Sequence, residues 1–282
     1  MARSVTEALA EGKDALQRSG SPTARLDAEV LLAHALGLRR VDLYVHPERP
    51  LDAAEERSYQ DSLARRARRE PVSHIVGRKE FYGLTFVVDR RVLVPRPETE
   101  VLVERALALA RARERAGLWI ADVGTGSGCI AVALALQLPQ ARVTAIDISA
   151  AALEVAGENV RRHHVADRVC LLEGDLCAPL AGRVDLLVAN LPYTVWEALP
   201  EGITAYEPRL ALDGSADGLA VYRRLLPQLP DHLQEGAAAL LEIGDGQEEA
   251  VVALAREVLP GVPVRVWPDG MGWARVVELG PW

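Results

Sequence analysis

Residues 119–128 read Trp-Ile-Ala-Asp-Val-Gly-Thr-Gly-Ser-Gly, and this stretch decides the fold. Its first five residues form a short apolar run typical of a buried strand, and a helical pattern follows from Ile130 to Leu138. Three glycines between strand and helix let the backbone turn tightly and approach a ligand closely. The spacing G-x-G-x-G lacks the last glycine of the dinucleotide fingerprint, and the Gly-Lys-Ser/Thr of a phosphate loop is missing too. The stretch therefore predicts a ligand-binding turn at the edge of a sheet.

Apolar strands and helices alternate on both sides of this turn. We expect strands near 119–123, 142–146, 169–172, 184–189, 237–243 and 262–267, and helices near 99–115, 130–138, 150–163, 217–230 and 246–258. Such alternation is typical of an α/β domain built on a Rossmann-like, doubly wound and mostly parallel sheet. Ligands bind these sheets at the carboxyl ends of the strands, so residues that directly follow a strand are candidates for a site.

The first 95 residues follow different patterns. Residues 4–70 carry helical periodicity throughout, whereas Phe81–Val88 resembles strand material around a glycine turn. We therefore expect a small all-helical N-terminal domain over 1–72, a β-hairpin connector over 73–95 and the α/β domain over 96–282.

Composition excludes several classes of protein. The chain has 282 residues, of which 49% are hydrophobic and 26% charged, enough apolar material for a sizeable core. No apolar stretch reaches the roughly 18 residues of a membrane span, and the N-terminus resembles neither a secretory signal nor a transit peptide. The three cysteines form no C-x-x-C pair and have no histidine at ligand spacing. We expect a cytoplasmic protein without a membrane partner, a disulfide framework or a metal site.

The charge is acidic and uneven. The net charge is −8; residues 1–90 carry 15 basic and 14 acidic residues, and the remainder carries 17 and 26. An acidic chain is poorly suited to non-specific binding of nucleic acid, which depends on neutralising phosphates. The one basic run, Arg65, Arg66, Arg68 and Arg69, fits the solvated end of a helix best. A patch for an acidic partner is the second interpretation.

Two acidic positions follow predicted strands. Asp147 ends the strand after the glycine turn, where an acidic side chain can hydrogen-bond ribose hydroxyls. An ordinary helix N-cap is the alternative for Asp147, although Ser149 competes for that place. Asp175 and Leu176 follow the next strand and could lie by an adenine edge or simply form a turn. Together these positions favour a nucleoside-containing ligand.

The turn Asn190-Leu191-Pro192-Tyr193 follows the apolar strand 184–189 and indicates the chemistry. The Asn190 side-chain oxygen and a neighbouring backbone carbonyl can each accept one N–H of a planar –NH2 group. Tyr193 can lie flat against that group, leaving the nitrogen facing a methyl donor. By itself the turn could be purely structural. Beside a glycine-rich turn and Asp147, an amino group as methyl acceptor becomes the better interpretation.

These motifs resemble class I S-adenosylmethionine-dependent amino-methyltransferases and, more specifically, the release factor glutamine methyltransferase family (PrmC/HemK type). The likeness runs in order from about residue 22 to the C-terminus. The stretches that carry it are Ala24–Glu29, Gly77–Leu84, Pro95–Glu100, Asp122–Gly128, Asn190–Tyr193, Tyr206–Pro208 with Ala211 and Leu212, and Glu242–Gly244 with Gln247.

The resemblance implies methyl transfer from S-adenosylmethionine to the side-chain amide nitrogen of the glutamine in the GGQ motif of peptide chain release factors, with S-adenosylhomocysteine as product. It implies that the cofactor is held by Gly124, Thr125, Gly126, Ser127, Gly128, Asp147, Asp175, Leu176 and Asn190, and the substrate by Asn190, Leu191, Pro192 and Tyr193. Asn190, Pro192 and Tyr193 would be catalytic. The stretch Arg96–Glu100 would flank the methionine part. The helical domain would dock the release factor, and we expect a monomer that binds no nucleic acid directly.

Two departures from the family pattern bear on activity. Leu191 stands where the family has the first proline of Asn-Pro-Pro-Tyr, and Ala274 replaces an aspartate near the C-terminus. Asn-Leu-Pro-Tyr also resembles the turn of rRNA adenine dimethyltransferases, so a nucleic-acid adenine or cytosine amino-methyltransferase is the rival enzyme. A non-catalytic adaptor and an NAD oxidoreductase fit less well, because the turn is intact and the dinucleotide fingerprint is incomplete.

Overall fold

The computed structural model describes residues 3–113 and 117–282, which form two compact units. One unit comprises the chain up to Arg78 together with Pro200–Tyr206, and the other comprises Lys79–Leu199 and Glu207–Trp282. None of the helices in these residues is both long and apolar enough to cross a bilayer.

The helical unit contains α1 (Val5–Arg18), α2 (Ala24–Ala35), α3 (Asp42–Val45), α4 (Ala53–Ala67), α5 (Val72–Val76) and α9 (Glu201–Thr204). Capping boxes at Ser4 and Asp52 start α1 and α4, because each side chain accepts the backbone N–H three residues on. Within the basic run, Arg65 pairs with Glu70 at 2.7 Å and Arg66 with Asp27 at 2.8 Å. At least two of the four arginines in that run therefore form ion pairs within the helical unit.

The hairpin consists of β1 (Arg78–Phe81) and β2 (Leu84–Val87), and it leads into η1 (Pro97–Thr99) and α6 (Glu100–Ala112). Its two turn residues, Tyr82 and Gly83, both have positive φ, as a two-residue hairpin turn requires. The Glu100 carboxylate accepts a hydrogen bond from the Tyr82 backbone N–H at 2.8 Å. The hairpin and the first helix of the α/β unit are thereby held together.

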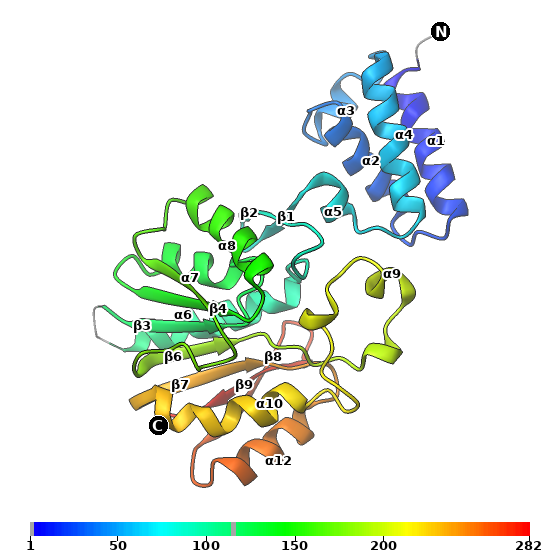
Figure 1. The fold of residues 1–282 in the computed structure, drawn as a ribbon. Coiled ribbons are helices and arrows are strands. Elements are labelled where there is room, and N and C mark those ends of the chain that lie inside the picture. Colours follow the sequence, from blue (N-terminus) through cyan, green and yellow to red (C-terminus); the bar gives the residue numbers. More distant parts are fainter. Residues whose placement is uncertain (1–2, 114–116) are drawn as a thin grey trace. The chain divides into compact units, whose positions relative to one another are not determined.

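Seven strands form the central sheet in the order β5-β4-β3-β6-β7-β9-β8 (Figure 1). They are β3 (Trp119–Val123), β4 (Arg142–Asp147), β5 (Val169–Glu173), β6 (Val184–Ala189), β7 (Leu233–Glu242), β8 (Val264–Pro268) and β9 (Ala274–Leu279). All neighbours pair in parallel except β9, which is antiparallel to β7 and β8. The strand order reverses between β3 and β6, which is where doubly wound sheets bind ligands.

Helices cover both faces of this sheet. One apolar cluster joins the sheet to α6, α7 (Cys129–Gln137) and α8 (Ala150–Arg162). A second cluster joins its other face to α10 (Ala220–Leu225), η4 (Leu226–Gln228), α11 (Leu229–His232) and α12 (Glu248–Val258). Two short 3-10 turns, η2 (Trp196–Ala198) and η3 (Arg209–Ala211), lie between β6 and α10. The predicted fold class, including the helical region and the hairpin, is confirmed.

Two predicted elements differ from the observed ones, and one observed strand was not predicted. The helix expected over 217–230 is divided into α10, η4 and α11, because Pro227 and Pro230 interrupt its hydrogen bonding. Strand β7 begins at Leu233, four residues before the expected start. Strand β9 was not predicted; its Glu278 is 2% exposed and pairs with Arg105, so a buried charge breaks the apolar pattern. Residues 114 and 115 of the helix expected over 99–115 lie outside the described residues.

Candidate active site

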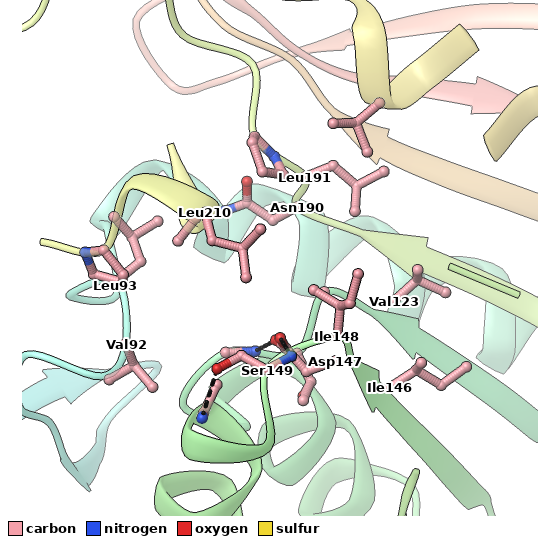
Figure 2. A pocket seen from close by; sticks show the side chains of 18 of the residues that line it. Val92, Leu93, Val123, Ile146, Asp147, Ile148, Ser149, Asn190, Leu191 and Leu210 are labelled. Carbon is pink, nitrogen blue, oxygen red and sulfur yellow. Dashed lines mark hydrogen bonds between the residues drawn. The ribbon is translucent and has the colours of Figure 1, made fainter. Parts of the chain in front are cut away.

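A cavity of about 550 Å³ opens at the carboxyl ends of β3, β4, β5 and β6 (Figure 2). Its inner wall consists of residues at or just after the ends of these strands, from 124–127, 129–130, 147–149, 174–176 and 190–192. Its outer wall consists of residues from 91–99, 208–213 and 220–224. All of these segments belong to the α/β unit. Clefts of this size accommodate ligands as large as a nucleoside joined to an amino acid.

Asp122 stabilises the glycine turn through hydrogen bonds to the turn and to the helix after it. It is fully buried, and its Oδ2 accepts hydrogen bonds from Thr125 Oγ1 at 2.7 Å and from the Ala131 backbone N–H at 3.1 Å. Burial, together with the nearby charge of Asp147, raises the pKa of Asp122 to about 7. The sequence motif contains Asp122 but predicted no role for it, although an acid near the end of a strand that leads into a glycine turn is a signal for one.

All three glycines of the turn have a positive φ, so its geometry requires them. Gly124 has φ +77°, and a Cβ there would lie 3.0 Å from the Leu191 side chain. Gly126 has φ +55° and faces open space in the cavity, so its backbone can contact a ligand directly. Gly128 does not line the cavity; it precedes α7, and a Cβ there would press on Ala156 of α8.

Asp147 is fixed by two backbone groups. Its Oδ2 accepts from the Gly126 N–H at 2.8 Å and its Oδ1 from the Ser149 N–H at 2.9 Å. Burial raises its pKa. The N-cap of α8 is Ser149, whose hydroxyl accepts from the Ala152 N–H, so the alternative role for Asp147 is wrong. Figure 2 shows Asp147 and Ser149 together at one side of the cavity.

Asp175 and Leu176 both line the cavity but differ in character. The Asp175 side chain is 45% exposed and forms an ion pair with Arg224, which also lines the cavity. Leu176 is buried with a positive φ and joins the apolar cluster on one face of the sheet. A planar apolar group could pack on Leu176, while Asp175 lies at the rim.

The turn after β6 brings Asn190, Leu191 and Pro192 into the cavity wall. Asn190 Nδ2 donates a hydrogen bond to Thr99 Oγ1 at 3.1 Å, whereas Asn190 Oδ1 accepts none from any residue that the structure describes. The side-chain amide therefore keeps a free acceptor at the cavity. Thr99 is 2% exposed and lines the cavity; sequence analysis included it only within the flanking stretch 96–100.

Tyr193, by contrast, is not among the cavity-lining residues. Its hydroxyl donates to Glu242 Oε1 at 3.2 Å, and its carbonyl accepts from Gln247 Nε2 at 3.0 Å. Glu242 is fully buried, and this burial raises its pKa to about 7. Burial and the Glu242 charge also raise the pKa of Tyr193. Glu242 and Gln247 were known from the sequence only as part of the family resemblance, because nothing in the local pattern connects them to Tyr193.

The outer wall is held together by Glu207, which sequence analysis did not assign to the site. Its carboxylate accepts from Arg96 Nη2 at 2.6 Å and from the Val94 N–H at 3.3 Å. Figure 2 shows Leu93 and Leu210, one from each wall segment, on the same side of the cavity. The segments lie more than 100 residues apart and have no periodicity, so only the fold brings them together.

Comparisons with known proteins identify the family. Residues 7–77 match the family model of the PrmC N-terminal domain, and residues 99–205 match that of the methyltransferase small domain. The release factor glutamine methyltransferase of Moorella thermoacetica is 46% identical over 272 residues, 95% of each chain. That of Geobacter sulfurreducens is 47% identical over 85% of this chain and 84% of its own.

The chain belongs to the release factor glutamine methyltransferase family. A solved methyltransferase of Pyrococcus furiosus covers 71% of this chain and 90% of its own, with a TM-score of 0.51 and 18% identity. That likeness shows the fold alone. Membership of a methyltransferase family implies S-adenosylmethionine as the methyl donor. Within the described residues, no three His, Cys, Asp or Glu side chains come together as a metal site.

The two departures from the family's motifs have simple structural settings. The Leu191 side chain is 3% exposed and packs in the apolar cluster beside Gly124. Because leucine has no polar side-chain atom, its backbone carbonyl is the acceptor that it can offer. Ala274 begins β9, and the following Arg275 pairs with Asp269 at 3.3 Å. Neither departure removes a side chain from the cavity wall.

Proposed function

We propose that this protein transfers a methyl group from S-adenosylmethionine to the side-chain amide nitrogen of the glutamine in the GGQ motif of peptide chain release factors. One observation carries the proposal: Asn190, at the end of β6, has its Nδ2 bound to Thr99 and its Oδ1 free at the cavity. A free acceptor suits a substrate that presents a –NH2 group. The chain is also more than 45% identical to two release factor glutamine methyltransferases over most of its length.

The cavity fits S-adenosylmethionine in size and in chemistry. The open space at Gly126 would take the methionine part, with Thr125 and Ser127 beside it. Asp147, held by two backbone N–H groups, would accept hydrogen bonds from the ribose hydroxyls. Leu176 supplies an apolar surface for the adenine, with Asp175 at the rim. The bound cofactor supplies an electrophilic methyl group on its sulfonium sulfur.

The side chains of this protein would act mainly by position. An amide nitrogen is a weak nucleophile, and among the described residues no lysine or histidine lines the cavity to deprotonate it. Asn190 Oδ1 and the Leu191 carbonyl would each accept one N–H of the glutamine amide. These bonds strengthen as the nitrogen becomes positive, which stabilises the transition state selectively. Pro192 would stiffen the turn, and Tyr193 would support it through Glu242.

We propose that this protein acts as a monomer in the cytoplasm and that its partner is a release factor. We propose that the helical unit docks the body of the release factor while its glutamine enters the cavity. Four arginines line the cavity, and each of them pairs with an acidic residue. They are Arg91, Arg96, Arg209 and Arg224. Such paired arginines offer little net charge to a phosphate backbone, which disfavours the nucleic-acid alternative.

A methyl-transfer assay with labelled S-adenosylmethionine tests the function. Its acceptors are an intact release factor, the same factor with the GGQ glutamine changed to alanine, bulk rRNA and DNA. We expect label on the intact factor alone. Label on rRNA or DNA would support the nucleic-acid alternative, and absence of label from every acceptor would contradict an enzymatic role.

A further inference from the structure

Thr99 lies directly behind Asn190, at the end of η1. It is 2% exposed, and its Oγ1 accepts the hydrogen bond from Asn190 Nδ2 at 3.1 Å. Its hydroxyl also interacts with the Glu242 carboxylate and lowers the pKa of that group, against the larger effect of burial. Thr99 therefore lies between the proposed substrate-binding amide and a buried acid whose pKa it affects.

Glu242 ends β7 and is fully buried. Its Oε1 accepts from the Tyr193 hydroxyl, while its Oε2 has no hydrogen-bond partner among the described residues. Burial is the dominant cause of its raised pKa, at about 7. The other titratable or charged groups that face it are Tyr193, Tyr222 of α10, Cys129 of α7, Glu98 of η1 and Arg275 of β9.

The direction of hydrogen bonding follows from what each group can donate. An ionised carboxylate only accepts, and a threonine hydroxyl has one proton. When Thr99 directs that proton to Glu242, only lone pairs remain for Asn190. Asn190 must then turn Nδ2 toward Thr99, which leaves Oδ1 for the cavity. In the reverse orientation, Nδ2 would meet the –NH2 group of a glutamine, donor against donor.

We propose that Thr99, held by Glu242, is a positioning residue that fixes the side-chain amide of Asn190 with Oδ1 toward the substrate. This inference rests on the proposed function, because it specifies how that same site recognises an amide. It assigns Thr99 no contact with the reacting atoms. It also explains why a buried acid lies behind a turn that binds a neutral group.

Thr99→Val removes the hydroxyl at nearly constant shape, and Thr99→Ser keeps it. With a release factor as substrate, we expect Thr99→Val to lower kcat about 10- to 100-fold, since small misplacements at a reacting centre have effects of this size. Thr99→Ser keeps the hydroxyl and should restore most of the rate. The matched control is Thr144→Val, which deletes another buried hydroxyl that accepts a hydrogen bond, from Trp119 Nε1 at 2.9 Å, away from the cavity.

The pH profile of kcat tests the role of Glu242. Protonated Glu242 can donate to Thr99, which frees the Thr99 proton for Asn190 Oδ1, so the wild-type rate should fall as pH drops below about 7. Glu242→Gln should lose this acid limb. An unchanged limb in Glu242→Gln would contradict the link to Thr99. If Glu242→Gln does not fold, the Thr99 variants decide alone.

The outcomes separate this inference from the proposed function. Absence of label on the release factor with the wild-type protein would overturn the function itself. If the wild-type protein labels the glutamine and Thr99→Val has the same kcat, only the positioning role is overturned. The positioning role is also overturned if kcat falls equally in Thr99→Val, Thr99→Ser and Thr144→Val, because Thr99 would then contribute only packing.

Discussion

The Glu207 carboxylate joins Arg96 at 2.6 Å and thereby connects two of the three chain segments of the outer cavity wall, 91–99 and 208–213. The Glu207 side chain is only 2% exposed, whereas that of Arg96 is 35% exposed. A buried charge that loses its partner is costly, because its desolvation is then uncompensated. This pair therefore determines how firmly the outer wall covers the cavity.

Glu207→Gln should lower the free energy of unfolding by about 1–3 kcal/mol, the range for hydrogen bonds to charged groups. We also expect S-adenosylmethionine to bind about tenfold more weakly, a loss of about 1.4 kcal/mol, because the wall loosens. Denaturant titration and calorimetry measure the two effects. Glu154→Gln is the control, since Glu154 pairs with Arg91 of the same wall but is 70% exposed. Equal effects of the two substitutions would show that burial of Glu207 is unimportant.

Asp147→Ala should weaken S-adenosylmethionine binding about 10- to 100-fold, because a charged acceptor is lost and the Gly126 N–H is released. Asp175→Asn should weaken it no more than about fivefold, since Asp175 is half exposed and shared with Arg224. Equilibrium titration of the purified variants gives both dissociation constants. If Asp175→Asn is the more damaging change, Asp147 is not the ribose acceptor.

Asn190→Ala should cost roughly 2–4 kcal/mol of transition-state stabilisation, as for the loss of a direct acceptor of developing charge. The loss should appear in kcat, because the acceptor acts most strongly once the nitrogen becomes positive. Initial rates at saturating release factor and cofactor measure it. Near-normal turnover by Asn190→Ala would remove Asn190 from the mechanism.

The inner wall of the site was predictable from sequence, whereas the outer wall was not. Gly126, Asp147 and Asn190 each lie at or shortly after the end of an apolar strand, and parallel strands bring their carboxyl ends to one edge. Glu207 and Leu210 lie in irregular chain, where no periodicity indicates which face is buried. Their partners are distant in sequence, so their roles depend on tertiary structure.

The same contrast explains what was missed in the fold. Buried Glu278 interrupts the apolar pattern of β9, and its partner Arg105 lies on α6, 173 residues earlier. Tyr193 follows a strand as Asn190 does, yet its side chain is engaged by Glu242 of a neighbouring strand. Position after a strand predicts that a residue reaches the sheet edge but not which way its side chain turns.

Asp122 should make the stability of the protein depend on pH. Its pKa is about 7 in the folded protein and about 3.9 in an unfolded chain. Between these values the folded state holds a proton that the unfolded state has lost, so stability falls as pH rises from about 4 to about 7. The free energy of unfolding of the wild type, relative to Asp122→Asn, should decline across this window. Parallel curves for the two proteins would mean that Asp122 is already ionised in the folded state.

Gly218→Ala should damage the Asn190–Tyr193 turn from outside the cavity. Gly218 has φ +72°, and a Cβ there would lie 2.3 Å from the Tyr193 carbonyl oxygen and 2.4 Å from Gln247 Nε2. We expect a loss of about 1–3 kcal/mol from overpacking, added to about 1–2 kcal/mol for the left-handed backbone, and a lower kcat. Gly246→Ala is the matched control, because Gly246 has φ +74° with nothing within 4 Å of its Cβ position. Denaturant titration and initial rates of both variants separate the clash from the backbone cost, and equal losses would show that the Tyr193 turn tolerates displacement.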